Sequence, residues 1–137
     1  MLVSGIASGG PDRAAYARWI AAVHQVARET GAAVAGPADP PHPGRNHYRV
    51  RVGSLRLLLH APAGLVAAVD DADLAAPFRE VPRADLFELA GFRVLAPADL
   101  ERRLTDALTA ELTEAERRDV AYHRTARVGD VIFNWFD

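Results

Sequence analysis

The sequence contains no cysteine, which excludes disulfide bonds, thiolate zinc sites and cysteine nucleophiles. Metal sites built from histidine and carboxylate ligands remain open. No apolar run approaches the roughly 18 residues that a membrane span needs. The N-terminus also lacks the basic start and long apolar region of a secretory signal peptide. We therefore expect a cytoplasmic protein without a membrane partner.

Lysine is also absent, so all 16 basic residues are arginine. Together with the abundant alanine, this is typical of the GC-rich coding sequences of high-GC bacteria. The formal net charge is only −2, so no global positive field attracts nucleic acid. We expect no nucleic-acid partner, and any attraction for an anion must come from a local group of arginines.

The chain has the length and composition of one soluble globular domain, with 137 residues, 50% of them hydrophobic. No internal repeat or long linker divides it, so we expect residues 1–137 to form a single domain. Residues 1–10 are rich in glycine but lack the Gly-Lys-Ser/Thr ending of a P-loop, which favours a flexible lead. The prolines of residues 36–46 lack the amide hydrogen that helices and sheets require, and they predict a surface loop.

Helical periodicity predicts a long helix over residues 11–30, with Pro11 and Asp12 in its first turn and Gly31 ending it. Its apolar stripe would consist of Tyr16, Trp19, Ile20, Val23, Val26 and Ala27. A short helix is expected over residues 83–90. Another should begin at Pro97 and bury Leu100, Leu104 and Leu108. The capping box of Thr113 and Glu116 predicts a last helix over residues 114–123.

The stretch from Arg45 to His60 predicts a β-hairpin, because Gly53 and Ser54 suit a two-residue type II′ turn. The predicted pairs are Val52 with Leu55, Arg51 with Arg56, Val50 with Leu57, Arg49 with Leu58, Tyr48 with Leu59 and His47 with His60. One face of the hairpin is then apolar, and the other carries three arginines and two histidines. Like charges directly opposite destabilise a sheet, so Arg51 and Arg56 require a carboxylate or an anion nearby.

A third strand is expected over residues 65–69, after the turn at residues 61–64. Its alternation places Leu65, Ala67 and Val69 on the same face as the arginines, which makes that face mixed. Three acidic residues come after this strand, namely Asp70, Asp71 and Asp73, and they form a corner suited to neutralise Arg56.

Residues 78–81 and 92–95 have the composition of short strands. The C-terminal residues include Phe133, Trp135 and Phe136, whose burial would contribute on the order of several kcal/mol. We expect this tail to dock on the core or on a partner, with Gly129 permitting a turn and Asp130 capping the element after it. Together the elements predict an α+β fold: a small antiparallel sheet of three to five strands packed with an N-terminal helix and C-terminal helices.

The mixed face is the first candidate binding site, and it is built by Arg49, Arg51, Arg56 and Leu58. Guanidinium groups match phosphate and carboxylate, so a small anionic ligand is one interpretation. Charge on a strand also protects a sheet against aggregation, which is the structural alternative. The apolar residues among the arginines favour another protein, or a second copy of this chain, because interfaces combine an apolar centre with arginine.

His42, His47 and His60 form a candidate metal site, because three imidazoles with an open position suit zinc and would acidify a bound water. The sequence lacks the close ligand pairs of familiar zinc motifs. The alternative is that two histidines merely occupy the hairpin ends, and we predict no cofactor.

Residues 118–123 read Arg-Asp-Val-Ala-Tyr-His. The spacing of arginine and histidine in these six residues resembles that of small helical endoribonucleases of the HEPN type. The resemblance implies RNA cleavage by Arg118 and His123, within an all-helical bundle.

The leading hypothesis is a non-catalytic binding or accessory module, such as an immunity or antitoxin protein, that contacts its partner through the arginine face. The rival is a small enzyme or ligand-binding protein that uses the histidines with the acidic corner, and a small ribonuclease is a third hypothesis. The weak catalytic candidates are His47, His60, Arg118 and His123.

Overall fold

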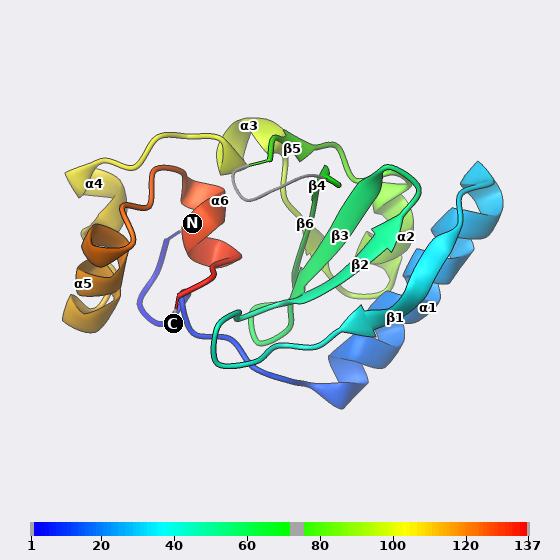
Figure 1. Ribbon diagram of the computed structural model, residues 1–137, viewed down its shortest axis with the longest axis horizontal. Helices are drawn as coiled ribbons and strands as arrows, with labels where there is room; N and C mark the ends of the chain where they lie inside the picture. Colours follow the sequence, from blue (N-terminus) through cyan, green and yellow to red (C-terminus); the bar gives the residue numbers. More distant parts are fainter. Residues whose placement is uncertain (1, 72–75, 137) are drawn as a thin grey trace.

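The structure is a computed structural model that describes residues 2–71 and 76–136. Helices lie on both faces of a central sheet (Figure 1). The elements are α1 (Arg13–Thr30), β1 (Val34–Asp39), β2 (Tyr48–Val52), β3 (Leu55–His60), β4 (Leu65–Asp70), β5 (Phe78–Arg79), α2 (Ala84–Leu89), β6 (Arg93–Val94), α3 (Pro97–Leu100), α4 (Asp106–Thr109), α5 (Glu114–Tyr122) and α6 (Val128–Ile132). This confirms the α+β fold.

The sheet separates two apolar cores. Leu57, Leu59 and Val66 pack against α1 and α2 on one face. Leu58 and Leu65, which alternate with them, pack against the C-terminal segment on the other face. The strand order is β1-β2-β3-β4-β5, and β6 pairs with the same strand as β5 but runs parallel to it. The sheet is otherwise antiparallel throughout the described residues.

The predicted hairpin register is confirmed for the five pairs from Tyr48–Leu59 to Val52–Leu55. Gly53 adopts a φ of 60°, the left-handed value that the first central position of the predicted turn demands. The third strand also has the predicted phase, since Val69 pairs with Arg56. The arginine face is therefore mixed, as expected.

Helix α1 begins and ends where the sequence predicts, apart from Pro11 and Asp12. The Asp12 side chain caps the helix by accepting a hydrogen bond from the amide of Ala15, and Gly31 ends it with a φ of 73°. Trp19 and Val23 of its apolar stripe are fully buried. Helices α2 and α5 also form within their predicted ranges, and α5 begins with the predicted capping box.

The prediction that residues 36–46 form only a loop was wrong for their first part. Residues up to Asp39 belong to β1, which pairs with β2 at the sheet edge. The pairing is irregular between Ala35 and Asp39, and Pro37 lies within this irregularity. A proline is tolerated there because one side of an edge strand needs no amide donor.

The prediction of one helix from Pro97 through Leu108 was also wrong, because two short helices, α3 and α4, form in this region. Between them, Arg103 forms a bridge with Arg127, and the amide of Leu104 donates to the carbonyl of Ala126 at 2.9 Å. This extended pairing with a distant segment satisfies the backbone groups that a continuous helix would have used internally.

Both ends of the described chain dock on the C-terminal core. Leu2 and Ile6 are buried, so the segment expected to be a flexible lead is packed. The aromatic tail docks as expected, with Phe133 buried and Trp135 37% exposed. None of the helices in the described part of the chain has the length and apolar character needed to span a membrane.

Candidate functional site

A hollow of about 370 Å³ lies between the arginine face of the sheet and the C-terminal segment. We call it the arginine groove. Its sheet wall includes Arg49, Arg56 and Leu58, which are three of the four predicted binding residues, and its opposite wall includes Phe133 and Trp135. The groove thus combines apolar walls with guanidinium groups.

Arg49 lies in the groove with few polar partners. Its guanidinium lies over the Trp135 ring, 4.8 Å from the centroid, as in a cation–π interaction. Its side chain is 22% exposed, yet its one ion pair is a 3.5 Å contact from Nε to the exposed carboxylate of Asp39. Arg49 donates no hydrogen bond to any residue that the structure describes, although a guanidinium carries five N–H donors. These donors are free for a ligand.

Arg56 and Arg51 obtain the carboxylate that their direct pairing requires. Asp71 lies 2.7 Å from Nε of Arg56 and 3.3 Å from Nη1 of Arg51. Arg51 does not line the groove, although it was predicted to share the site. Asp70 pairs instead with Arg79, and Asp73 lies outside the described residues.

Arg127 fixes the C-terminal wall of the groove. It binds both carboxylate oxygens of Asp130 at 2.8 Å, which is the bidentate geometry of strong charge-assisted hydrogen bonds. It also donates to Glu101 at 2.8 Å and lies over the Phe78 ring. Asp130 therefore anchors Arg127, whereas the sequence predicted that it would cap a following element.

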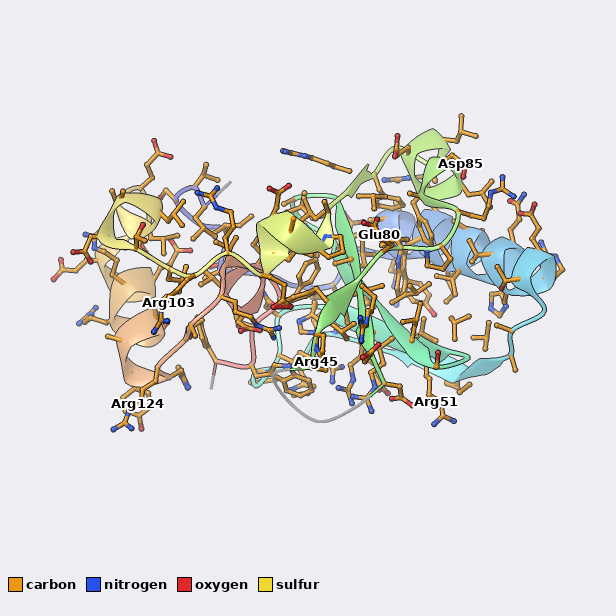
Figure 2. All side chains as sticks on the ribbon, turned by 90° about the horizontal axis from the view of Figure 1, so that it is seen from above. Arg45, Arg51, Glu80, Asp85, Arg103 and Arg124 are labelled. Atoms are coloured by element: carbon orange, nitrogen blue, oxygen red, sulfur yellow. The ribbon has the colours of Figure 1, made fainter. Side chains whose placement is uncertain are left out.

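The two residues of the ribonuclease hypothesis do not form a separate site. His123 lines the groove and stacks on Phe136, with ring centroids 4.8 Å apart. Arg118 is exposed on α5, outside the groove lining. The α+β fold contradicts the all-helical bundle that the resemblance implied. The neighbouring Arg124 borders the groove, but its side chain extends outward from the end of α5 (Figure 2).

His47 is only 1% exposed, and a network of hydrogen bonds fixes its protonated nitrogen. The Asn46 amide nitrogen donates to the carbonyls of Ala7 and Ile132, so its oxygen is the acceptor. That oxygen accepts from the Asn134 amide at 2.9 Å and lies 2.8 Å from Nδ1 of His47. Nδ1 must therefore carry the hydrogen, and Nε2 carries the lone pair.

The surroundings keep His47 neutral. Burial, followed by the charges of Arg45 and Arg49, lowers its pKa well below the ordinary value of 6.5. Its ring makes T-shaped contacts with the rings of Phe133 and Trp135, at centroid distances of 5.7 and 5.9 Å. Nε2 makes no hydrogen bond with the residues described.

The three histidines of the predicted metal site are not arranged as a set of metal ligands, because most of their ring nitrogens bind other groups. Nε2 of His60 lies 2.8 Å from the carbonyl of Ile6, and its Nδ1 accepts from Ala63, so both nitrogens are occupied. Nδ1 of His42 accepts from Gly44 within its own loop. Within the described ranges, no group of three histidine or acidic residues has an arrangement that could hold a metal ion.

A second hollow, of about 610 Å³, lies between the N-terminal segment and α5. Its buried polar side chains hold the chain together. Glu116 is 6% exposed and accepts hydrogen bonds from the amides of Gly5, Ala7 and Thr113 at 2.7 to 2.9 Å. The side-chain amides of Asn46 and Asn134 donate to the backbone carbonyls of Ile132 and Val131. These buried polar groups therefore have structural partners within the chain.

Sequence reasoning missed Trp135 as a specific partner of Arg49, and Asn46 as the residue that orients His47. The alternation of His47 and Arg49 placed both on one face, but no local pattern identifies a contact such as that between Asn46 and Asn134, which are 88 positions apart. Comparison with known proteins adds no assignment, because no family model, curated protein or solved structure matches this chain.

Proposed function

We propose that this protein is a non-catalytic binding module that receives an acidic segment of a partner protein in the arginine groove. The observation that carries the proposal is Arg49, a largely buried guanidinium on the Trp135 ring whose hydrogen-bond donors have no partner among the described residues. Nε1 of Trp19 is the one fully buried side-chain polar atom without a partner among the described residues, so the Arg49 donors are open to an acceptor supplied from outside.

The apolar lining of the groove favours a polypeptide over an isolated anion. Leu58, Val69 and Phe133 line the walls beside the arginines. In a segment that alternates acidic and apolar side chains, the apolar side chains would be buried against these walls. The acidic side chains would reach the guanidinium groups. Protein interfaces show this combination of an apolar centre with arginine.

The existing carboxylates do not compete strongly with such a ligand. Asp39 is 62% exposed and contacts Arg49 at 3.5 Å, so it contributes little to holding the guanidinium. Asp71 pairs with Arg56 and lies outside the groove lining. Asp130 is the acidic residue in the lining, and Arg127 already binds it.

A peptide array can test this proposal. Ten-residue peptides that combine aspartate or glutamate with leucine or phenylalanine would be screened, and the best binder measured by fluorescence anisotropy. We expect Arg49→Gln to weaken binding by about tenfold or more, because a hydrogen bond to a charged group contributes about 1.5 to 3 kcal/mol. Arg28→Gln is the matched control, since Arg28 is exposed on α1, which covers the opposite face of the sheet.

Two results would contradict the proposal. One is an array on which no acidic peptide binds better than its amide counterpart, with asparagine and glutamine replacing the acids. The other is an equal loss of affinity in Arg49→Gln and Arg28→Gln, which would show a response to net charge alone. Circular dichroism establishes that both variants are folded.

A further inference from the structure

His47 presents an unused hydrogen-bond acceptor beside the unused donors of Arg49. We propose that the arginine groove selects an anionic group that carries its own hydrogen-bond donor, and that Nε2 of His47 accepts a hydrogen bond from this donor. The inference rests on the proposed function. It narrows the acidic segment to one whose anionic group lies beside a hydroxyl or an amide N–H.

The two side chains belong to one site. Arg49 belongs to β2, and His47 lies in the bend directly before this strand. Both contact Trp135: Arg49 lies over the ring face, and His47 makes a T-shaped ring contact. Both also line the arginine groove. A ligand that binds the guanidinium therefore lies within reach of the imidazole.

The available atom of the imidazole is an acceptor. Nδ1 is committed to Asn46, whose own orientation is set by the carbonyls of Ala7 and Ile132. Nε2 has no partner among the described residues, and it is not sealed in the core. The described residues contain one fully buried side-chain polar atom without a partner, and that atom is Nε1 of Trp19. Nε2 of His47 thus opens to the groove with its lone pair.

This pairing of donor and acceptor discriminates between anions of similar shape and charge. Monohydrogen phosphate has oxygens that accept from Arg49 and a P–OH that can donate to Nε2. Sulfate offers the same accepting oxygens but no hydrogen near neutral pH, so it would bring lone pairs against the lone pair of Nε2. An acceptor left facing another acceptor loses its hydrogen bond in a desolvated site.

Inorganic phosphate and sulfate are the minimal probes for this chemistry. The chemical shift of Nε–Hε of Arg49 would be followed by NMR during titration with each sodium salt, near neutral pH and at constant ionic strength. We expect phosphate to bind about tenfold more tightly than sulfate, the effect of one missing hydrogen bond at a buried acceptor. His47→Gln should reduce this ratio to about one, because a glutamine amide can turn its N–H toward sulfate.

His24→Gln is the matched control and should retain the preference for phosphate, because His24 is exposed on α1. Equal affinities for the two ions in the wild type would overturn the role of His47 while leaving an anion site at Arg49. The absence of any shift at Arg49 with either ion would overturn the anion site itself, and with it the proposed function. The tautomer of His47 can also be measured in the wild type by nitrogen NMR. A spectrum showing that Nε2 carries the hydrogen would overturn the inference.

Discussion

Replacement of Glu116 by glutamine tests how the N-terminal segment is held to the fold. The carboxylate is buried at the start of α5, where Oε1 accepts from the amides of Gly5 and Thr113, and Oε2 accepts from the amide of Ala7. Glutamine has nearly the same shape but only one accepting oxygen. Its amide nitrogen must then face an N–H group.

The magnitude can be worked from these three contacts. If the glutamine oxygen replaces Oε1, the variant loses the bond to Ala7 and leaves two donors facing each other, at a cost of about 1 to 3 kcal/mol. The remaining bonds to Gly5 and Thr113 change from charged to neutral acceptors and become weaker. The favourable interaction of the negative charge with the start of α5 is also lost, about 0.3 to 1 kcal/mol. We expect the free energy of unfolding to fall by about 2 to 4 kcal/mol.

Urea denaturation near pH 7 measures this loss, and Glu114→Gln is the control because Glu114 is exposed in the same helical turn. Burial raises the pKa of Glu116, but the amide hydrogen bonds outweigh it and leave the pKa below its ordinary value. The stabilisation is therefore present above about pH 4.3, the unfolded pKa, and disappears as the pH falls through the folded pKa. Equal stability of the two variants near neutral pH would show that the Glu116 carboxylate does not hold the N-terminal segment.

Three further predictions concern the core and the groove. Gly129→Ala should lower the free energy of unfolding by about 1 to 3 kcal/mol in urea, because its new Cβ would overlap the Phe78 ring; an unchanged midpoint would contradict this packing. The pKa of His47 is lowered in the folded state, so stability should decrease below about pH 6.5 with a slope of up to about 1.4 kcal/mol per pH unit. His47→Gln should remove that slope, and a persistent slope would assign it to other groups. Asp71→Asn should lower the free energy of unfolding by about 1 kcal/mol at low salt and by less in 1 M sodium chloride, because it leaves Arg51 and Arg56 to repel each other. An effect independent of salt would count against an ionic role of Asp71.

The sequence was sufficient for the hairpin and the strand after it. The Gly53 turn fixes the register, and strict alternation leaves one choice of face, so Arg49 and Leu58 are paired as predicted. The same local rules failed where a distant segment supplied the backbone partners. Pro37 enters an edge strand because β2 lies beside it, and the region of Leu104 is extended because residues near Ala126 pair with it.

The candidate site was predictable only in its charged half. Arg49 and Arg56 stood out because the hairpin register brings arginines to a mixed face. The state of His47 depends on the ring of Trp135, which contacts it, and on Asn134, which bonds to Asn46; both come from the other end of the chain. His47, which was predicted as a metal ligand, is a neutral hydrogen-bond acceptor in the groove. No spacing in the sequence predicts this role, because it depends on how the C-terminal tail docks.

Binding of an acidic segment in the arginine groove would be seen first at Arg49. The most direct measurement is an NMR titration of arginine Nε–Hε resonances with the strongest acidic peptide from the array. We expect the resonance of Arg49 to shift most, that of Arg56 to show the next largest shift, and that of Arg28 on the opposite side of the sheet to remain unchanged. Shifts spread evenly over the exposed arginines, or confined to residues outside the groove, would contradict this expectation.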